Sequence, residues 1–179
     1  MYLEKLKLDG KVAVVTGGGR AIGLACSTAL AEAGAKLELA KKLGAAVTVN
    51  VRSRNLVDVV KKETDGWGVD VAFECSGNQK VAPTLFEAIC PGGRVVFIGM
   101  PVEPIAYDVT NAAVKEARVE HIFRYAHVFP RCVAMMGSGD VDVSPLITKT
   151  FGFEDSIRAF EFATRPPTGS VKVQIEMPS

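Results

Sequence analysis

The order of its segments predicts an α/β fold in which helices cover both faces of a parallel sheet. Short apolar runs typical of strands alternate with helical segments of ordinary length from Val69 to the C-terminus. A glycine cluster stands between the first strand and the first helix. With 179 residues, 48% of them apolar and 23% charged, the chain is long enough for one sizeable core. We therefore expect a single domain over residues 1–179.

The first elements surround the glycine cluster. Lys11–Thr16 is expected to be a buried strand, and Ala21–Ala33 a helix that ends at Gly34. A short lysine-rich segment, Lys36–Gly44, follows, and Ala46–Val51 is typical of another strand.

The later elements alternate regularly. Helices are expected at Asn55–Lys62, Pro83–Ile89, Ala112–Ala117, Val128–Met136 and Glu154–Thr164, and strands at Val69–Cys75, Arg94–Gly99, Arg118–Arg124, Leu146–Phe151 and Val171–Met177. Pro91-Gly92-Gly93 is expected to form the turn before the strand that begins at Arg94.

Composition excludes several classes of partner. A net charge of +1 gives no reason to expect nucleic acid or an anionic membrane. No apolar run has the length of a membrane span, and no secretory signal opens the sequence. The four cysteines, Cys26, Cys75, Cys90 and Cys132, form no CxxC pair, so we expect buried thiols in a reducing cytoplasm.

The glycine cluster has the chemistry that a dinucleotide requires. Glycines let a backbone approach the pyrophosphate, and the helix that follows offers free N–H groups and a positive dipole end. The predicted pyrophosphate turn consists of Gly17, Gly18, Gly19, Arg20, Ala21, Ile22 and Gly23. An ordinary tight turn without a ligand is the alternative.

The spacing Thr16-Gly17-x-x-x-Ala21-x-Gly23 resembles the TGxxxGxG turn of short-chain dehydrogenases/reductases, with alanine in the place of the middle glycine. The whole of Met1–Ala35 resembles the start of a short-chain polyol dehydrogenase. Arg20 resembles the basic residue that some of these enzymes use for the 2′-phosphate of NADP. A solvated arginine at the start of a helix is the alternative.

The remainder resembles a second family. Trp67–Gly77, Pro91–Pro101 and Phe123–Tyr125 resemble the nucleotide-binding half of medium-chain, zinc-dependent dehydrogenases, above all the sorbitol and xylitol dehydrogenases. This resemblance covers nearly all of residues 37–179. It implies that the cofactor is lined by Cys75, Ser76 and Gly77 on the adenosine side, by Gly99, Met100 and Pro101 at the nicotinamide ribose, and by Phe123 and Arg124 at the carboxamide.

Physical reasoning agrees with those positions, because ligands of open α/β sheets bind outside the carboxyl ends of the strands. Ordinary turns between strand and helix are the alternative for all three groups, and an ion pair is the alternative for Arg124. The resemblance to the two dehydrogenase families implies that the bound cofactor is NAD or NADP.

The two resemblances meet near residues 35–37, so the chain resembles a chimera of two families. Between Gly34 and Gly44 there is hardly room for both a strand and a helix. We expect a three-layer, Rossmann-like, doubly wound sheet that lacks or shortens its second strand. In the alternative, Lys36–Leu39 is a stunted strand and Glu38 is its ribose-binding acid, which leaves the choice between NAD and NADP open.

Catalytic residues are not found in the sequence. Short-chain enzymes use a Tyr-x-x-x-Lys pair, and none of the three tyrosines has a lysine four residues later. Medium-chain polyol dehydrogenases use a zinc ion held by a separate domain, which is not expected here. Structural or surface roles are expected for His121 and His127, and no metal is expected.

Three functional hypotheses follow. The first is an NAD(P)-binding domain of polyol dehydrogenase descent that is catalytically incomplete alone. The second is a subunit or fragment of a working NAD-dependent polyol dehydrogenase. The third is a non-enzymatic module that forms homo-oligomers through the edge strand Arg118–Arg124. The last strand, Val171–Met177, is expected to swap, to pair between chains or to be poorly ordered.

Overall fold

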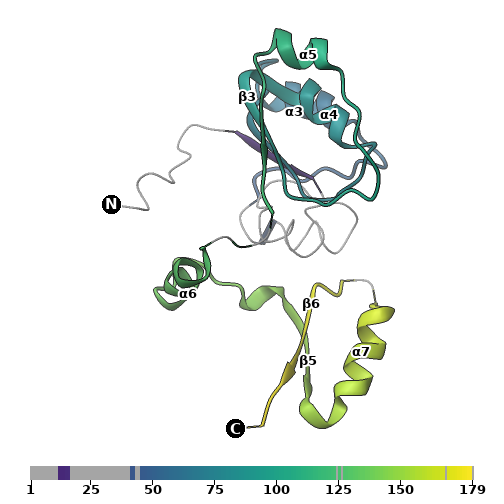
Figure 1. Ribbon diagram of the computed structural model, residues 1–179, viewed down its shortest axis with the longest axis vertical. Coiled ribbons are helices and arrows are strands. Elements are labelled where there is room, and N and C mark those ends of the chain that lie inside the picture. Colours follow the sequence, from purple (N-terminus) through teal and green to yellow (C-terminus); the bar gives the residue numbers. More distant parts are fainter. Residues whose placement is uncertain are drawn as a thin grey trace. The chain divides into compact units, whose positions relative to one another are not determined.

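A computed structural model describes residues 12–16, 41–42, 45–123, 125, 127–167 and 169–178. The chain divides into two compact units, Met1–Ile122 and Phe123–Ser179, each of which is described by itself (Figure 1). The expectation of a single domain over residues 1–179 stays a prediction. Within the described residues, no helix is both long enough and apolar enough to cross a membrane.

The first unit contains a four-stranded sheet in the order β1-β2-β3-β4. Its strands are β1 (Ala13–Thr16), β2 (Val69–Glu74), β3 (Ile89–Phe97) and β4 (Arg118–His121). Every neighbouring pair runs parallel, as expected for strands that are joined by helical crossovers. The predicted α/β, Rossmann-like fold with a parallel sheet is confirmed.

Three helices of this unit are described: α3 (Leu56–Glu63), α4 (Ala82–Ala88) and α5 (Val109–Val114). The Asn55 side chain begins α3 by accepting hydrogen bonds from the backbone N–H groups of Val57 (2.8 Å) and Asp58 (3.3 Å). Helix α4 packs against β2 and β3 and also contacts α3 and α5. It thereby joins the helical layer to the two central strands.

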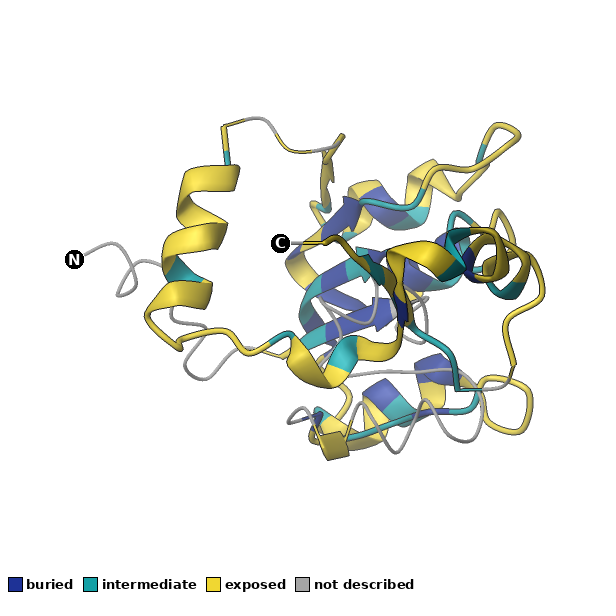
Figure 2. Cartoon of the chain, turned by 90° about the horizontal axis from the view of Figure 1, so that it is seen from below, coloured by how far each residue is buried: buried dark blue, intermediate teal, exposed yellow. Residues whose placement is uncertain are grey.

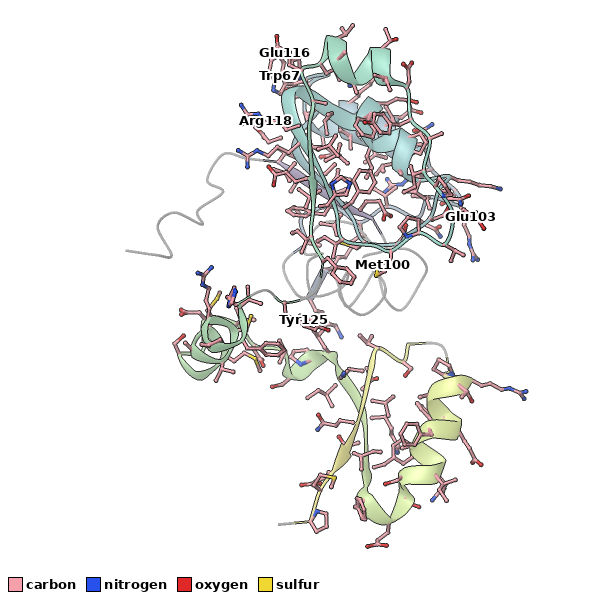
Figure 3. The ribbon with its side chains drawn as sticks, in the orientation of Figure 1. Trp67, Met100, Glu103, Glu116, Arg118 and Tyr125 are labelled. Carbon is pink, nitrogen blue, oxygen red and sulfur yellow. The ribbon has the colours of Figure 1, made fainter. Side chains whose placement is uncertain are left out.

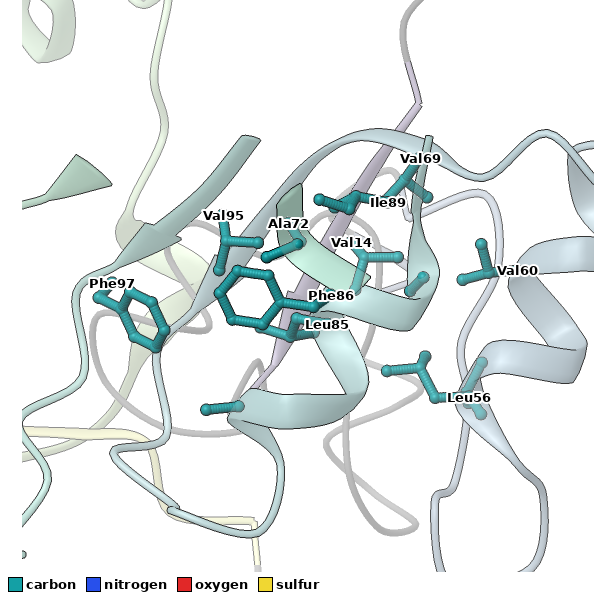
Figure 4. Close-up of a cluster of buried hydrophobic side chains, with 14 residues drawn as sticks. Val14, Leu56, Val60, Val69, Ala72, Leu85, Phe86, Ile89, Val95 and Phe97 are labelled. Atoms are coloured by element: carbon teal, nitrogen blue, oxygen red, sulfur yellow. The ribbon is translucent and has the colours of Figure 1, made fainter. Parts of the chain in front are cut away.

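The hydrophobic core lies between α4 and these strands (Figure 4). Buried residues, dark blue in Figure 2, gather in the strands and helices of this unit. The core consists of Val14, Val49, Leu56, Val60, Val69, Ala72, Ala82, Leu85, Phe86, Ala88, Ile89, Val95, Phe97 and Ala112.

Strand β3 includes the expected turn at Pro91-Gly92-Gly93. Ile89 pairs with Val69 and Arg94 pairs with Val71, so β3 carries extra residues that form a bulge at this point. Gly92 has a φ of +73° and donates its N–H to the carbonyl of Lys115 at 2.6 Å. The chain therefore does bend at Pro91-Gly92-Gly93, but β3 continues on both sides of this bend.

The expected strand at Ala46–Val51 is wrong. Residues 45–50 form no strand and residues 51–53 form a turn. Asn50 explains the difference, because its side chain accepts from the N–H of Arg52 and its carbonyl accepts from the N–H groups of Ser53 and Arg54, each at 3.0 Å. Val49 is nevertheless buried in the core. The expected helix Ala21–Ala33 and the alternative strand Lys36–Leu39 lie outside the described residues.

Lys115 fastens the amino end of β3 to the last turn of α4. Its Nζ donates to the carbonyl oxygens of Phe86 (2.9 Å), Glu87 (2.8 Å) and Ile89 (2.9 Å), which satisfies acceptors that a helix end leaves open. Burial, and then the charge of Lys61, lower the pKa of Lys115 below its ordinary value, against a weaker opposite effect of Glu87 and Cys90.

The second unit contains α6 (Phe129–Gly137), the short 3-10 helices η2 (Ser144–Leu146) and η3 (Phe153–Asp155), and a parallel pair of strands, β5 (Ile147–Gly152) and β6 (Lys172–Glu176), with α7 (Ser156–Thr164) between them in the chain. Phe151 of β5 contacts Phe162 of α7 edge to face, with 5.6 Å between the ring centroids.

Two expectations are corrected in the second unit. The last strand, β6, pairs in parallel with β5 of its own chain, so the expectation that it would swap, pair between chains or be poorly ordered is wrong. The prediction of buried cysteines is wrong for Cys132, which is exposed on α6, whereas Cys90 of the first unit is buried.

Candidate functional site

The turns that follow β2 and β3 lie together at the carboxyl ends of the two strands. Glu74, the last residue of β2, pairs in register with Phe97, the last residue of β3, so both strands end at the same level. Cys75, Ser76 and Gly77 follow β2, and Gly99, Met100 and Pro101 follow β3 by one more residue.

Glu74 connects the two turns. Its side chain is fully buried. One carboxylate oxygen of Glu74, Oε1, accepts from the N–H of Ser76 at 2.9 Å and from the Ser76 hydroxyl. The other oxygen, Oε2, accepts from the N–H of Gly77 at 2.9 Å. The Glu74 carbonyl accepts from the N–H groups of Ile98 and Gly99, each at 2.8 Å. Side chain and backbone of one residue thus hold the turn after β2 and the turn after β3.

The glycines in these turns are required by contact as well as by conformation. Gly77 has a φ of +65°, and a Cβ at this position would lie 2.6 Å from the Met100 carbonyl oxygen. A Cβ on Gly99 would collide with the backbone nitrogen of Gly77 and would lie 2.5 Å from Glu74 Oε2. The two turns therefore touch through their backbones, which glycine alone permits.

The two turns are partly exposed to solvent. Ser76 is exposed and Met100, which is labelled in Figure 3, is 72% exposed, while Cys75, Gly77 and Gly99 are partly covered. The Ser76 hydroxyl also accepts from the N–H of Asn78 at 3.1 Å, which continues the ordered turn toward α4. A backbone surface of this kind suits a ligand that is recognised by close approach.

The structure brings together six of the predicted site residues: Cys75, Ser76, Gly77, Gly99, Met100 and Pro101. Phe123 is 62% exposed and belongs to the second unit, so its predicted role at the carboxamide stays a prediction. Arg124 and the predicted pyrophosphate turn, residues 17–23, lie outside the described residues.

Sequence reasoning missed Glu74. An acidic residue at the last position of the apolar strand Val69–Glu74 was the available signal, because an ionisable side chain that follows buried positions needs specific partners. Of the two histidines, His121 stacks on Phe97 with ring centroids 5.6 Å apart, and His127 is exposed with a φ of +55°.

Comparison with protein families identifies one model, described as zinc-binding dehydrogenase, that matches residues 18–138. A "putative D-xylulose reductase" of Agrobacterium fabrum is 42% identical, covering 94% of this chain and 51% of that protein. A sorbitol dehydrogenase of Bacillus subtilis is 32% identical, covering 78% of this chain and 40% of its own length. The chain therefore spans between two fifths and about half of the length of these curated relatives.

Solved structures show the same fold. An alcohol dehydrogenase of Thermus sp. ATN1 matches 94% of this chain and 51% of its own with a TM-score of 0.83 and 24% identity. A "putative zinc-binding dehydrogenase" of Sinorhizobium meliloti, solved with NADP bound, matches 93% of this chain and 52% of its own with a TM-score of 0.78 and 25% identity.

These comparisons correct the expectation that no metal is involved. The matched family is described as zinc-binding, so that expectation is wrong. The described residues do not themselves fit a zinc ion, since no three or more of their His, Cys, Asp and Glu side chains lie close enough together to hold a metal.

The family match covers the strands that carry the site. The predicted resemblance to zinc-dependent polyol dehydrogenases is confirmed as a relationship to D-xylulose reductases and sorbitol dehydrogenases. The chain belongs to the zinc-binding dehydrogenase family and is related to its D-xylulose reductases and sorbitol dehydrogenases.

Proposed function

We propose that these residues form the part of a polyol–ketose oxidoreductase that binds NAD(H) or NADP(H). One observation carries the proposal: the turns after β2 and β3 are held in backbone contact, by Glu74 and two glycines, at the carboxyl edge of a parallel sheet. This edge is where open α/β sheets bind nucleotides.

The described residues fit such a cofactor on one side of its site. Cys75, Ser76 and Gly77 would line the adenosine side, and Gly99, Met100 and Pro101 would line the nicotinamide ribose. The pyrophosphate would lie at residues 17–23 and the carboxamide at Phe123 and Arg124. The S. meliloti structure with bound NADP supports a dinucleotide in a protein of this fold. Once bound, the cofactor supplies or accepts a hydride.

The names of the relatives favour a polyol and its ketose as substrates. One relative is named for the reduction of D-xylulose, a ketose, and another for the dehydrogenation of sorbitol, a polyol. We extend this substrate class to the present chain as part of the proposal.

We further propose that these 179 residues bind the cofactor without completing the reaction. The sequence has no Tyr-x-x-x-Lys pair, and the chain spans about half the length of its matched relatives. A working dehydrogenase, or a subunit of one, remains the alternative, as does a module that pairs through the exposed strand β4. The two-family junction near residues 35–37 and a cytoplasmic location stay predictions. The family match, which begins at residue 18, runs across that junction.

A titration of the purified chain with NADH and with NADPH, followed by cofactor fluorescence, tests the proposal. Saturable binding of either cofactor supports it, and no binding at millimolar cofactor overturns it. Oxidation of xylitol or sorbitol by the chain, with NAD or NADP and added zinc, would overturn catalytic incompleteness and favour the working enzyme. Sedimentation of the cofactor-free chain tests the oligomer, which a concentration-independent monomer would exclude.

A further inference from the structure

We propose that Glu74 is a positioning residue for the dinucleotide, because it fixes the turn after β2 against the turn after β3. The inference rests on the proposed function. Glu74 is buried and would not touch the ligand. It would act through Ser76, Gly77 and Gly99, which line the surface that the ligand meets.

The hydrogen bonds of the carboxylate set the shape of the first turn. A buried carboxylate is unfavourable unless donors surround it, so the chain must keep the Ser76 and Gly77 donors turned inward. Two successive N–H groups directed at one carboxylate leave the turn little freedom. The Ser76 hydroxyl adds a third donor, and its own oxygen orders Asn78.

Backbone contacts also fix the position of the turn after β3 relative to the turn after β2. The Glu74 carbonyl binds the N–H groups of Ile98 and Gly99, and Gly99 lies so close to Gly77 and Glu74 Oε2 that a methyl group would not fit. Any displacement of the carboxylate would therefore move Gly99 and Met100 relative to Gly77.

A contribution to stability alone would have a different signature. The ladder between β2 and β3 uses the backbone of Glu74, whereas its carboxylate accepts from Ser76 and Gly77, which lie beyond the ladder in the turn. If the side chain merely stabilised the fold, its replacement would lower the free energy of unfolding but leave cofactor affinity of the folded protein unchanged.

The test compares Glu74→Gln, Gly99→Ala and their double variant with wild-type chain. Glutamine keeps the size of the side chain but turns an NH2 group toward one of the inward donors. Alanine at position 99 keeps the carboxylate but forces the two turns apart. Glu63→Gln makes the same chemical change at an exposed position of α3 and serves as the matched control. Titrations with NADH and NADPH are run at a temperature at which circular dichroism shows each variant folded.

We expect Glu74→Gln to weaken cofactor binding about tenfold, the usual effect of losing one hydrogen bond to a charged group. The emission of bound NADH should shift toward that of free NADH, while Glu63→Gln should match wild type. The double variant should bind no more weakly than Gly99→Ala alone, because both changes disturb one contact.

Unchanged affinity in folded Glu74→Gln, or fully additive losses in the double variant, overturns the inference and leaves the proposed function standing. Wild-type chain that binds neither cofactor at millimolar concentration overturns both. If Glu74→Gln does not fold, Glu74→Asp takes its place, because the shorter side chain keeps the charge but draws the carboxylate away from the N–H groups of Ser76 and Gly77. Weaker binding by the folded variant supports the inference, and wild-type binding overturns it.

Discussion

Strands β2 and β3 are fastened at both ends by a glycine in close backbone contact and by one ionisable side chain, but the two ends differ in what they hold. At the amino end, Gly68 lies against residues 88–90, and the Lys115 ammonium binds the carbonyl groups at the end of α4. At the carboxyl end, Gly99 lies against Gly77, and the Glu74 carboxylate binds N–H groups of a turn.

The difference lies in what remains open to solvent. The amino-end contacts tie a strand to a helix, so their loss should appear as lost stability. The carboxyl-end contacts tie two turns whose outer side is exposed, so their loss should appear in binding. A close glycine contact and one ionisable side chain therefore stabilise the fold at the amino end and shape the candidate site at the carboxyl end.

The largest effect is expected for Gly68→Ala. Gly68 has a φ of +101°, and a Cβ would lie 2.7 Å from the Cys90 nitrogen and 2.8 Å from the Ala88 carbonyl oxygen. Strain and collision together should lower the free energy of unfolding by about 3 kcal/mol or more. Urea unfolding followed by circular dichroism measures this loss.

Gly66→Ala provides the matched control, since Gly66 has a φ of +85° but no atom within 4 Å of its would-be Cβ. It should lose about 1 kcal/mol from the left-handed conformation alone. Equal losses in the two variants would show that the contact with β3 contributes nothing.

Lys115→Met should lower the free energy of unfolding by about 1–3 kcal/mol, because three carbonyl acceptors at the end of α4 lose their donor. Cofactor affinity of the folded variant should not change. Lys80→Met, at an exposed lysine, is the control. A weaker cofactor affinity of folded Lys115→Met would contradict the proposal that the contacts at the amino end affect stability alone.

Asn55→Ala should lower the free energy of unfolding by about 1 kcal/mol, because α3 loses the side chain that accepts from Val57 and Asp58. Since the two hydrogen bonds that Asn55 would lose lie within the first turn of α3, this variant calibrates a loss of stability without any effect on binding. Thermal unfolding and an NADH titration on the same sample measure the two quantities, and a change in affinity would show that binding follows stability in general.

The smallest effect is the pH dependence that Lys115 contributes. Its pKa in the folded chain is below 10.5, whereas the unfolded amine keeps its ordinary value. Between these two values the unfolded state binds more protons, so the free energy of unfolding should rise with pH. Urea titrations of wild type and Lys115→Met at about pH 8 and about pH 10 should show this rise in wild type only. A parallel response of both proteins would contradict the assignment.

The strands and turns of the candidate site could be predicted from sequence because their signals are local. A β-rich run that ends in Ser-Gly or Gly-Met-Pro marks both the strand and its carboxyl end. Glu74 was missed although its place at the end of an apolar strand was a local signal, and its contact with Gly99, which is distant in sequence, is visible only in the fold. Ala46–Val51 failed for the opposite reason: a favourable strand composition was overridden by the local hydrogen bonds of Asn50.

Trp67 is the one tryptophan of the sequence, so intrinsic fluorescence reports on the two ends of the strands differently. It stands just before β2, at the amino end, and is 62% exposed (Figure 3). In the folded chain its emission should resemble that of a solvated indole, so unfolding should shift the emission maximum little. The length of β2, about 20 Å for six residues, separates it from the turn after Glu74. Intrinsic fluorescence should therefore report an absorbing ligand at that turn, through energy transfer, better than it reports the folding of the chain.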